Sequence, residues 1–541
     1  MTNVSGDRPR RRAAAAEAGP TARNLTVACL SIQSSCAVGP AIGARRLTST
    51  APWATSDLGF GRCGGRNLAA SEGQTDWAAD IGTRVFWLAL LVGLVVGAIG
   101  SGFHLLIDAA QDARARLVAG AFDAPLQVHQ IAALAEQIPP EWRSVLTVEP
   151  VLAARFIVVT VLVALALGIA RRLVRHVAPE AAGSGVQEIE GTLLGSRRLR
   201  WRRVLPVKFL GGGLALGTGL VLGREGPTIH MGGAAAAGIA RATNATLSET
   251  RALLAAGAGA GLAAAFNAPI AGVLFVIEEM RRHAPYSFQG YHAVLIACVA
   301  ATFVTEGITG TGPELRLAMA TPAFAHYPYF LVLGVLLGAC GAIFNRVLLG
   351  ALDMFGIWSA RAGWTLVLAL AISVATALFL LPAAIGGGEQ IIRPLLAQPL
   401  GLQALGLLLA VRLAMTLASY CAGTPGGVFA PILGLATVAG VGCMELARQV
   451  APGLDLDAAA FVAAAMAALF TGSVRAPLVG VVLVAELTDA YPALLAITLS
   501  TAMASLTAAA VGGRPLYELL LERTLRLAAP ARPARGLDPD R

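Results

Sequence analysis

Glu225 is the residue of this 541-residue chain whose type and position most clearly suggest chemistry. It stands in the segment Gly223-Arg224-Glu225-Gly226-Pro227, between apolar stretches, where we expect a helix to begin. A carboxylate in an apolar membrane region is costly unless it has a function. At a helix N-terminus it can occupy an anion site itself, and its protonation would free that site for another anion. Glu225 could therefore couple anion occupancy to a proton, and the alternative is that it only caps its helix.

Two more glycine-rich segments precede short apolar helices and read Gly183-Ser184-Gly185-Val186-Gln187 and Gly426-Gly427-Val428-Phe429-Ala430-Pro431. Such breaks place free backbone N–H groups at the positive end of a helix dipole, and glycine lets the backbone approach a ligand closely. Three such segments predict an anion site built from helix ends rather than full charges. That suits transport, because a full charge would bind the anion too tightly. The alternative is that they are ordinary helix breaks.

Glu278 and Glu279 end an apolar helix that we expect to begin near Pro269. About ten residues at ~1.5 Å each give ~15 Å, which is about half the hydrocarbon thickness of a bilayer. If this helix starts near the midplane, the pair reaches an interface, and one of the two could take protons from the cytoplasm. The alternative is a solvated helix end.

Lys208 is the only lysine of the chain, and it lies inside an apolar run after Pro206. The other basic side chains are arginines, which indicates an arginine-rich genome composition. Buried charges are usually paired. We therefore predict a structural ion pair between Lys208 and Glu190 rather than direct binding of an anion by Lys208.

The composition indicates which elements must position these residues. Apolar residues make up 56% of the chain, charged residues 13%, and the mean hydropathy is +0.69. A soluble domain carries about 25% charged residues, so we predict an all-α polytopic membrane protein. Several apolar segments are shorter than the ~20 residues that a span requires, and irregular backbone within a membrane is tolerated where it is buried or lines a polar cavity. The segments run roughly 84–110, 150–170, 203–223, 227–242, 251–280, 290–309, 326–350, 363–383, 401–421, 428–450, 458–473, 477–487 and 491–512.

The net charge of +9 is best explained by topology. Basic loops favour the cytoplasmic side, so we predict a multi-pass protein of the cell inner membrane with both termini in the cytoplasm and no nucleic-acid partner. The basic segments are Arg171-Arg172 with Arg175, Arg197 to Arg203, Arg281-Arg282 and the arginines after Arg514. The seven cysteines contain no CxxC pair and the histidines are scattered, so we expect neither a metal site nor a cofactor.

Three regions follow from these patterns. Residues 1–80 have no sustained apolar span and are predicted to be a disordered N-terminal tail. A cytoplasmic tail, a wrongly chosen start codon and a targeting segment are the readings left open. Residues 81–526 form the predicted transmembrane domain, and 527–541 a short cytoplasmic tail.

An internal repeat divides the transmembrane domain into about 84–310 and 326–525. NAPIAGVLFVIEE at 267–279 and RAPLVGVVLVAEL at 475–487 share six of thirteen positions at an offset of 208, and Pro227 and Pro431 are offset by 204. Repeats with broken helices are typical of transporters with a site at the midplane. Glu486 matches Glu278 and would face the other side of the membrane if the halves are inverted.

Together these motifs resemble the CLC family of chloride channels and proton-coupled chloride transporters. The resemblance covers roughly 84–526 and rests on motifs in the family's order, which are GSG followed by EIEG at 183–191, GREGP at 223–227, FNAP…EEMR at 266–281, GGVFAP at 426–431 and PLY at 515–517. It is nearest to the bacterial exchangers without C-terminal regulatory domains. It implies two inverted repeats of tilted, broken helices and a homodimer in the lipid bilayer with one anion pathway in each subunit.

The resemblance also implies roles for single residues. Glu225 would be the gating and outer proton glutamate, Glu279 the inner proton-transfer glutamate, and Glu278 beside it an inner entry point for protons. Chloride would be bound by the hydroxyls of Ser184 and Tyr517 and by the backbone N–H groups of Val428 and Phe429. With both proton glutamates present, we predict a chloride/proton antiporter, with a passive voltage- or pH-gated chloride channel as the alternative.

Gln187 departs from the family pattern, which usually has proline there. A proline favours the first helical turn, so the helix start that presents Ser184 is expected to be looser and anion affinity or selectivity to differ. Ser184 goes with chloride rather than nitrate in the family, and Tyr517 argues against its fluoride exchangers. An intramembrane enzyme is disfavoured, since the sequence has no GxSxG, HExxH or phosphate-binding loop.

Overall fold

The apolar segments form helices in the computed structural model, which describes residues 82–119, 150–280, 287–361 and 363–528. The predicted tail 1–80 lies outside the described residues, as do the pair Arg281-Arg282 and all but the first two residues of the tail 527–541. Within the described ranges, eight helices are long and apolar enough to cross a membrane. The predicted all-α membrane fold is therefore confirmed.

The helices fall into two series of matching order. The first series consists of α1 (Arg84–Ala119), α3 (Pro150–His176), α4 (Val186–Leu193), α5 (Trp201–Gly217), α6 (Glu225–Ala242), α7 (Leu247–Phe266), α8 (Pro269–Glu278) and α9 (Phe288–Thr309). The second consists of α10 (Tyr327–Arg361), α11 (Gly363–Leu380), α12 (Glu389–Ala397), α13 (Leu402–Cys421), α14 (Phe429–Val450), α15 (Ala458–Val474), α16 (Pro477–Thr488) and α17 (Leu494–Ala510). The helix α18 (Leu516–Ala528) follows.

Helix ends are fixed by the same chemistry in both series. Thr246 and Glu249 form a capping box at the start of α7, and the Asp457 side chain accepts from Ala460 N at the start of α15. Both helices end in a residue with a left-handed backbone, which is Asn267 after α7, at φ 53°, and Arg475 after α15, at φ 70°. A proline then begins the next short helix, as its fixed φ favours. The repeated sequence therefore produces a repeated helix break.

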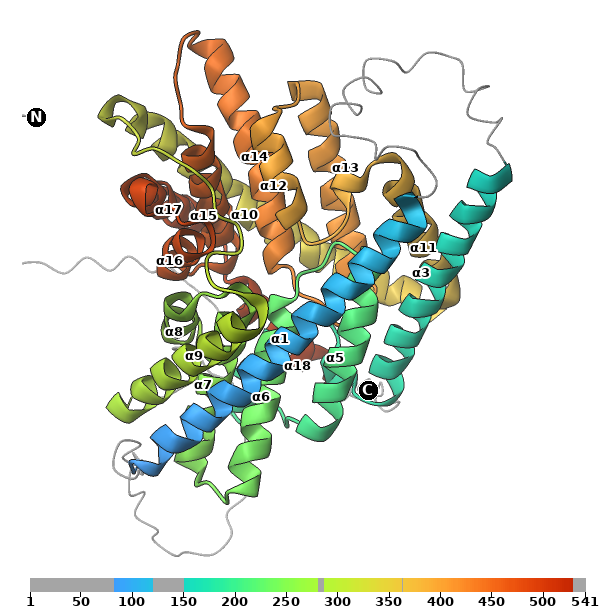
Figure 1. Cartoon of the computed structure of the whole chain (residues 1–541), viewed down its shortest axis with the longest axis vertical. Coiled ribbons are helices and arrows are strands. Elements are labelled where there is room, and N and C mark those ends of the chain that lie inside the picture. Colours follow the sequence, from blue (N-terminus) through green and yellow to red (C-terminus); the bar gives the residue numbers. More distant parts are fainter. Residues whose placement is uncertain (1–81, 120–149, 281–286, 362, 529–541) are drawn as a thin grey trace, which may run out of the picture. The chain divides into compact units, whose positions relative to one another are not determined.

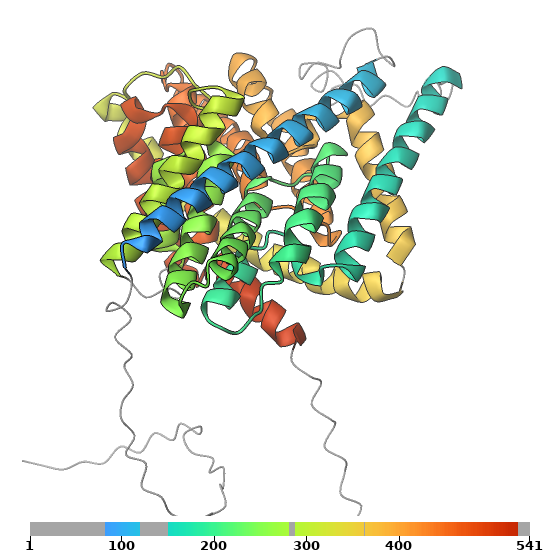
Figure 2. The same ribbon diagram turned by 60° about the horizontal axis from the view of Figure 1, so that its bottom comes forward.

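The packing repeats as well. The contacts of α6 with α7, α1 with α9, and α7 with α9 recur as contacts of α14 with α15, α10 with α17, and α15 with α17. In Figure 1, α6–α9 gather together in green, α15–α17 in red, and α8 lies beside α16. Figure 2 shows α1, in blue, running obliquely across the green helices.

The two series run in opposite directions where they meet. Gly223, just before α6, and Gly427, just before α14, form an antiparallel bridge with both N···O distances at 2.8 Å. At the C-terminal end of α8, the Glu278 carboxylate accepts from the N-terminus of α16, while Glu486 of α16 accepts from the N-terminus of α8. The helices α8 and α16 are thus antiparallel neighbours, which agrees with the predicted inverted repeats.

Glycine permits the closest helix contacts. A Cβ atom on Gly232 of α6 would lie 2.1 Å from the carbonyl oxygen of Gly257 of α7, and one on Gly257 would lie 2.4 Å from that of Gly232. Small residues let backbones approach in this way in membranes, where the bilayer gives no hydrophobic drive for helix association. Some of the 61 glycines of the chain are therefore needed for helix packing.

Candidate functional site

The three predicted glycine-rich segments meet at one place. Gly183 N donates to Thr424 O and Gly426 N to Gly183 O, each at 3.0 Å. The Gly223–Gly427 bridge joins the third segment to this pair. Backbone hydrogen bonds thus connect the starts of α4, α6 and α14, and these residues share one buried region as the sequence predicted.

Glu225 lies at the start of α6 and is fully buried. Its Oε1 accepts from Ala430 N at 2.8 Å, so the carboxylate occupies the N-terminus of α14 rather than only capping its own helix. Its Oε2 has no hydrogen-bond partner among the described residues. A Cβ on Gly223 would lie 2.0 Å from this Oε2, so a glycine at 223 is what leaves space for the carboxylate.

The predicted chloride ligands lie next to this carboxylate. Ser184 is fully buried, and its Oγ has no hydrogen-bond partner in the described part of the chain. This oxygen packs against Gly226, where a Cβ would lie 2.5 Å from it. Tyr517, in the first turn of α18, is also buried and lies near the Ser184 side chain. An unsatisfied buried hydroxyl is unusual in a native structure, and here it faces a site predicted for an anion.

Val428 and Phe429 form the start of α14, as N-cap and first helical residue. The backbone N–H groups at such a position have no partner within the helix. The Phe429 ring is held by Phe266 and Phe470, whose ring centroids lie 5.4 Å and 4.3 Å away. Aromatic packing therefore fixes the backbone that presents these N–H groups.

The predicted partner of Lys208 is wrong. Its Nζ donates to Gly183 O at 2.6 Å and to Ser184 O at 2.9 Å, and no ion pair joins it to Glu190 in the described ranges. Both carbonyls precede α4, and the ammonium satisfies that of Ser184 and shares that of Gly183 with Gly426 N. Glu190 is buried with its Oε2 unpartnered, and its electrostatic neighbours include Glu279 and Glu518. Lys208 thus orients the loop of Ser184, while Glu190 belongs to a group of carboxylates.

Arg412 is the counterpart of Lys208 in the second series. It lies 204 residues later, on α13, and donates to the carbonyls of Ala383, Ile385 and Gly386 at 3.0–3.3 Å, just before α12. Sequence reasoning missed Arg412 because arginine is abundant in this chain. The signal was its offset from Lys208, which equals that between Pro227 and Pro431.

Glu278 and Glu279 have different surroundings. Both oxygens of Glu278 accept from backbone, namely from Leu478 N at 3.2 Å and Val479 N at 2.8 Å. Glu279 acts electrostatically on both Tyr517 and Glu190. Glu278 therefore caps α16, and Glu279 is an electrostatic neighbour of the predicted chloride ligand Tyr517. The entry of protons at Glu278 stays a prediction.

A basic cavity of about 480 Å³ opens beside the Ser184 loop. Its lining includes Gly183, Gln187, Tyr420 and the arginines Arg171, Arg175, Arg197 and Arg523. Arg197 pairs with Glu188 and Arg523 with Asp353, each at 2.8 Å. Sequence reasoning assigned Arg171 and Arg175 to membrane topology only and missed Tyr420, whose hydroxyl packs near Gly183. The cavity places basic side chains beside the loop that carries Ser184.

Gln187, which stands where the family usually has proline, forms a side-chain hydrogen bond at the start of α4. Its Oε1 accepts from Gly185 N at 3.2 Å, and α4 begins at Val186 directly after Gly185. The helix start is therefore formed, but one N–H group of the glycine-rich segment is used by a side chain instead of remaining available to an anion.

On the other side of Glu225, charged residues form what we term the His104 cluster, made of His104, Asp108, Arg224 and Glu314. Arg224 is bonded to both Glu314 and His104, and His104 Nε2 lies 2.9 Å from Asp108 Oδ2. Glu389, at the start of α12, acts electrostatically on Glu225. Sequence reasoning missed this cluster, because its members come from three separate segments. Titratable groups thus continue from Glu225 toward this side.

Comparisons with known proteins agree with this site. The family model described as "Voltage gated chloride channel" matches residues 162–509. The H(+)/Cl(-) exchange transporter ClcA of Vibrio cholerae is 38% identical over 448 residues, 82% of this chain and 90% of that protein. ClcA of Salmonella typhi is 42% identical over 361 residues, 65% of this chain and 76% of that protein.

A solved structure of a slow cyanobacterial Cl-/H+ antiporter superposes with a TM-score of 0.71 at 33% identity, over 82% of this chain and 99% of that one. The family model matches more than half of the sequence, and the relatives are matched over most of their length. Both findings point to the same family as the three glycine-rich segments that meet at the site. The chain belongs to the voltage gated chloride channel family, the CLC family.

Proposed function

We propose that this protein is a chloride/proton antiporter that moves chloride against protons through a pathway in each subunit. One observation carries the proposal, namely that the Glu225 carboxylate occupies the N-terminus of α14, next to the unpartnered Ser184 hydroxyl. A carboxylate and an anion compete for the same donors, so proton binding to one and chloride binding to the other are linked.

Chloride binds in the proposed mechanism to the hydroxyls of Ser184 and Tyr517 and to the N–H groups of Val428 and Phe429. Protonation removes the charge of Glu225 and weakens its bond from Ala430 N. The side chain then leaves the N-terminus of α14, and chloride takes its place. Deprotonation reverses the exchange. No full positive charge binds the anion, since Lys208 is committed to two carbonyls.

Protons reach Glu225 from one side through Glu279 and from the other through the His104 cluster. Glu279 interacts with Glu190 and with Tyr517, which in turn interacts with Glu225, so the charges are electrostatically linked. The relatives named H(+)/Cl(-) exchange transporter and the Cl-/H+ antiporter structure support coupling over passive conduction.

The protein is proposed to lie in the cell inner membrane with both termini in the cytoplasm. The basic ends of α3 and the basic residues after α17 support that orientation. A homodimer is proposed from the family resemblance, and exposed apolar residues on α8, α9, α16 and α17 support it, including Ile270, Phe303, Leu478 and Leu495. We expect no cofactor and no metal, and a transporter rather than an enzyme.

Transport in proteoliposomes tests the coupling. With chloride high inside and protons equal on both sides, outward chloride movement should carry protons inward, against the proton gradient that builds up, and be recorded by an external pH electrode. Chloride efflux with no proton movement would instead support the passive channel of the same fold.

A further inference from the structure

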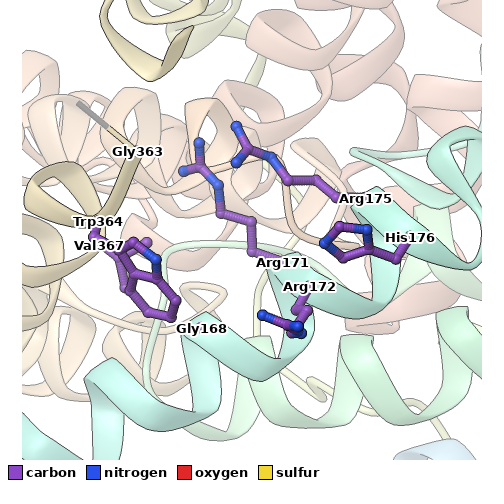
Figure 3. A pocket seen from close by; sticks show the side chains of 8 residues that line it. All are labelled: Gly168, Arg171, Arg172, Arg175, His176, Gly363, Trp364 and Val367. Carbon is purple, nitrogen blue, oxygen red and sulfur yellow. The ribbon is translucent and has the colours of Figure 1, made fainter. Parts of the chain in front are cut away.

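A second anion site is suggested by a pocket at the end of α3, away from the buried carboxylate. It has a volume of about 100 Å³ and lies between α3 and α11, which pack side by side. Its lining consists of Gly168, Arg171, Arg172, Arg175, His176, Gly363, Trp364 and Val367. Figure 3 shows the basic side chains of α3 with Trp364 and Val367 opposite. We refer to it as the α3–α11 pocket.

The positive charge of this pocket is not neutralised by protein carboxylates. None of the lining residues is acidic, and in the described part of the chain no ion pair is formed by Arg171, Arg172 or Arg175. Arg171 and Arg175 both donate to the hydroxyl of Ser359, which brings two like charges together. Such a cluster is stabilised by an anion with several acceptor oxygens, as a phosphate diester has.

The surroundings of the pocket are apolar and face outward. On α3 the exposed side chains include Ile157, Leu165 and Ile169, and on α11 they include Leu368 and Ile372. Both helices are long and apolar enough to cross a membrane. The pocket therefore lies at the end of an apolar surface, formed by α3 and α11, that is suited to the acyl chains of a lipid.

Trp364 marks the level of the bilayer interface. Its side chain is 69% exposed, yet its ring lies against Gly168, where a Cβ would be 2.9 Å from Trp364 Cζ3. Tryptophan is enriched at membrane interfaces because its ring is apolar and its N–H is polar. A glycine at 168 leaves room for this ring beside the arginines.

We propose that the α3–α11 pocket binds the headgroup phosphate of an anionic phospholipid. Arg172, Arg175 and His176 contact the phosphate, Trp364 packs at the glycerol level, and the acyl chains follow the exposed apolar residues of α3 and α11. Basic pockets between transmembrane helices bind such headgroups on the cytoplasmic side, and the orientation proposed above places this end of α3 there. The site is distinct from the chloride site, although Arg171 and Arg175 also line the basic cavity.

Native mass spectrometry of the purified full-length protein, titrated with dioleoylphosphatidylglycerol, tests this site. Dioleoylphosphatidylcholine has the same acyl chains without net charge and should bind about thirtyfold more weakly, as expected for two arginines near a headgroup. Arg172→Gln should weaken binding of the anionic lipid about fivefold, and Arg172→Lys should restore it. Trp364→Leu should weaken the binding of both lipids. Arg172 and Trp364 do not line the basic cavity, so the variants at these two positions should still transport chloride. Retained chloride transport would show that the variants fold.

Arg198→Gln is the matched control, because Arg198 is exposed and lies outside the pocket. It should leave lipid binding unchanged. Equal weakening by Arg172→Gln and Arg198→Gln would overturn the proposal, because general surface charge would then explain binding. Equal binding of the two lipids would overturn it as well. Displacement of the lipid by inorganic phosphate at equal concentration would show a site for free phosphate instead of a lipid.

Discussion

Glu278 and Glu486 each cap the helix on which the other lies. The Glu278 oxygens accept from the N-terminus of α16, with Val479 N at 2.8 Å, and those of Glu486 accept from that of α8, with Ala271 N also at 2.8 Å. The two contacts are related by the inverted repeat. The two glutamates, which occupy equivalent positions in the two sequence repeats, thus each cap a helix of the opposite half.

Loss of either cap should destabilise the protein. Glu278→Ala and Glu486→Ala each leave two backbone donors unpaired, so each should lower the free energy of unfolding by about 2 kcal/mol, measured as a lower Tm in detergent. Glu445→Ala is the control, because Glu445 forms only a partly exposed ion pair with Arg448 at 3.9 Å, and should change stability by less than about 1 kcal/mol. An unchanged Tm for Glu278→Ala together with lost proton transport would instead make Glu278 part of the proton route.

Lys208 and Arg412 should differ in their effect on chloride. Lys208→Met leaves the Ser184 carbonyl unpaired and leaves the Gly183 carbonyl with Gly426 N as its donor, so the Ser184 loop loses its orientation and chloride binding should weaken about tenfold or more. Arg412→Met removes the equivalent bonds before α12, which holds none of the proposed chloride ligands, so it should lower stability while chloride affinity is kept. Isothermal titration calorimetry with chloride measures both variants. Equal chloride affinities for the two would contradict the positioning role of Lys208.

Gln187→Pro should strengthen chloride binding. Proline suits the first turn of a helix, and the substitution removes the Oε1 that accepts from Gly185 N. The freed N–H group becomes available at the inner end of the site, so we expect an affinity increase of about fivefold, as for one neutral hydrogen bond. Titration of chloride into wild type and variant compares them. A weaker affinity would mean that the Gln187 side chain supports the helix start better than proline does.

Removal of the Tyr517 hydroxyl should weaken central chloride binding. Tyr517→Phe keeps the ring packed in the first turn of α18 but removes one of the two hydroxyls assigned to the anion, so the affinity should fall about tenfold. Tyr491→Phe is the control, because Tyr491 is more than half exposed, and its binding heat should match that of wild type. Identical heats for both variants would exclude the Tyr517 hydroxyl as a ligand.

Sequence reasoning succeeded where local chemistry fixes the structure. Glycine and proline inside apolar runs located the helix starts around Glu225 and Phe429, because these residues end helices whatever packs nearby. It placed an apolar segment at 203–223, but α5 ends at Gly217, and Leu220 and Leu222 are buried in irregular backbone. An apolar stretch in the sequence therefore indicates that the residues are buried, but it does not show that they form a helix.

The rest depended on tertiary contacts. The short helices α4 and α12 carry too few apolar residues to stand out as segments, and the partner of Lys208 was wrong because loop carbonyls become available only when the fold places them. The His104 cluster joins residues that are far apart in the sequence. Arginine composition concealed Arg412 and the α3–α11 pocket, since each arginine alone looked like a topology signal.

The most direct test of the central claim compares Glu225→Gln and Glu279→Gln with wild type in proteoliposomes, recording chloride efflux and proton uptake together. We expect wild type to move both ions and Glu225→Gln to pass chloride without protons, because a neutral amide mimics the protonated carboxyl. Glu279→Gln should pass chloride with proton movement abolished. Proton movement that remains coupled to chloride in both variants would contradict the proposed roles of Glu225 and Glu279 in proton transfer.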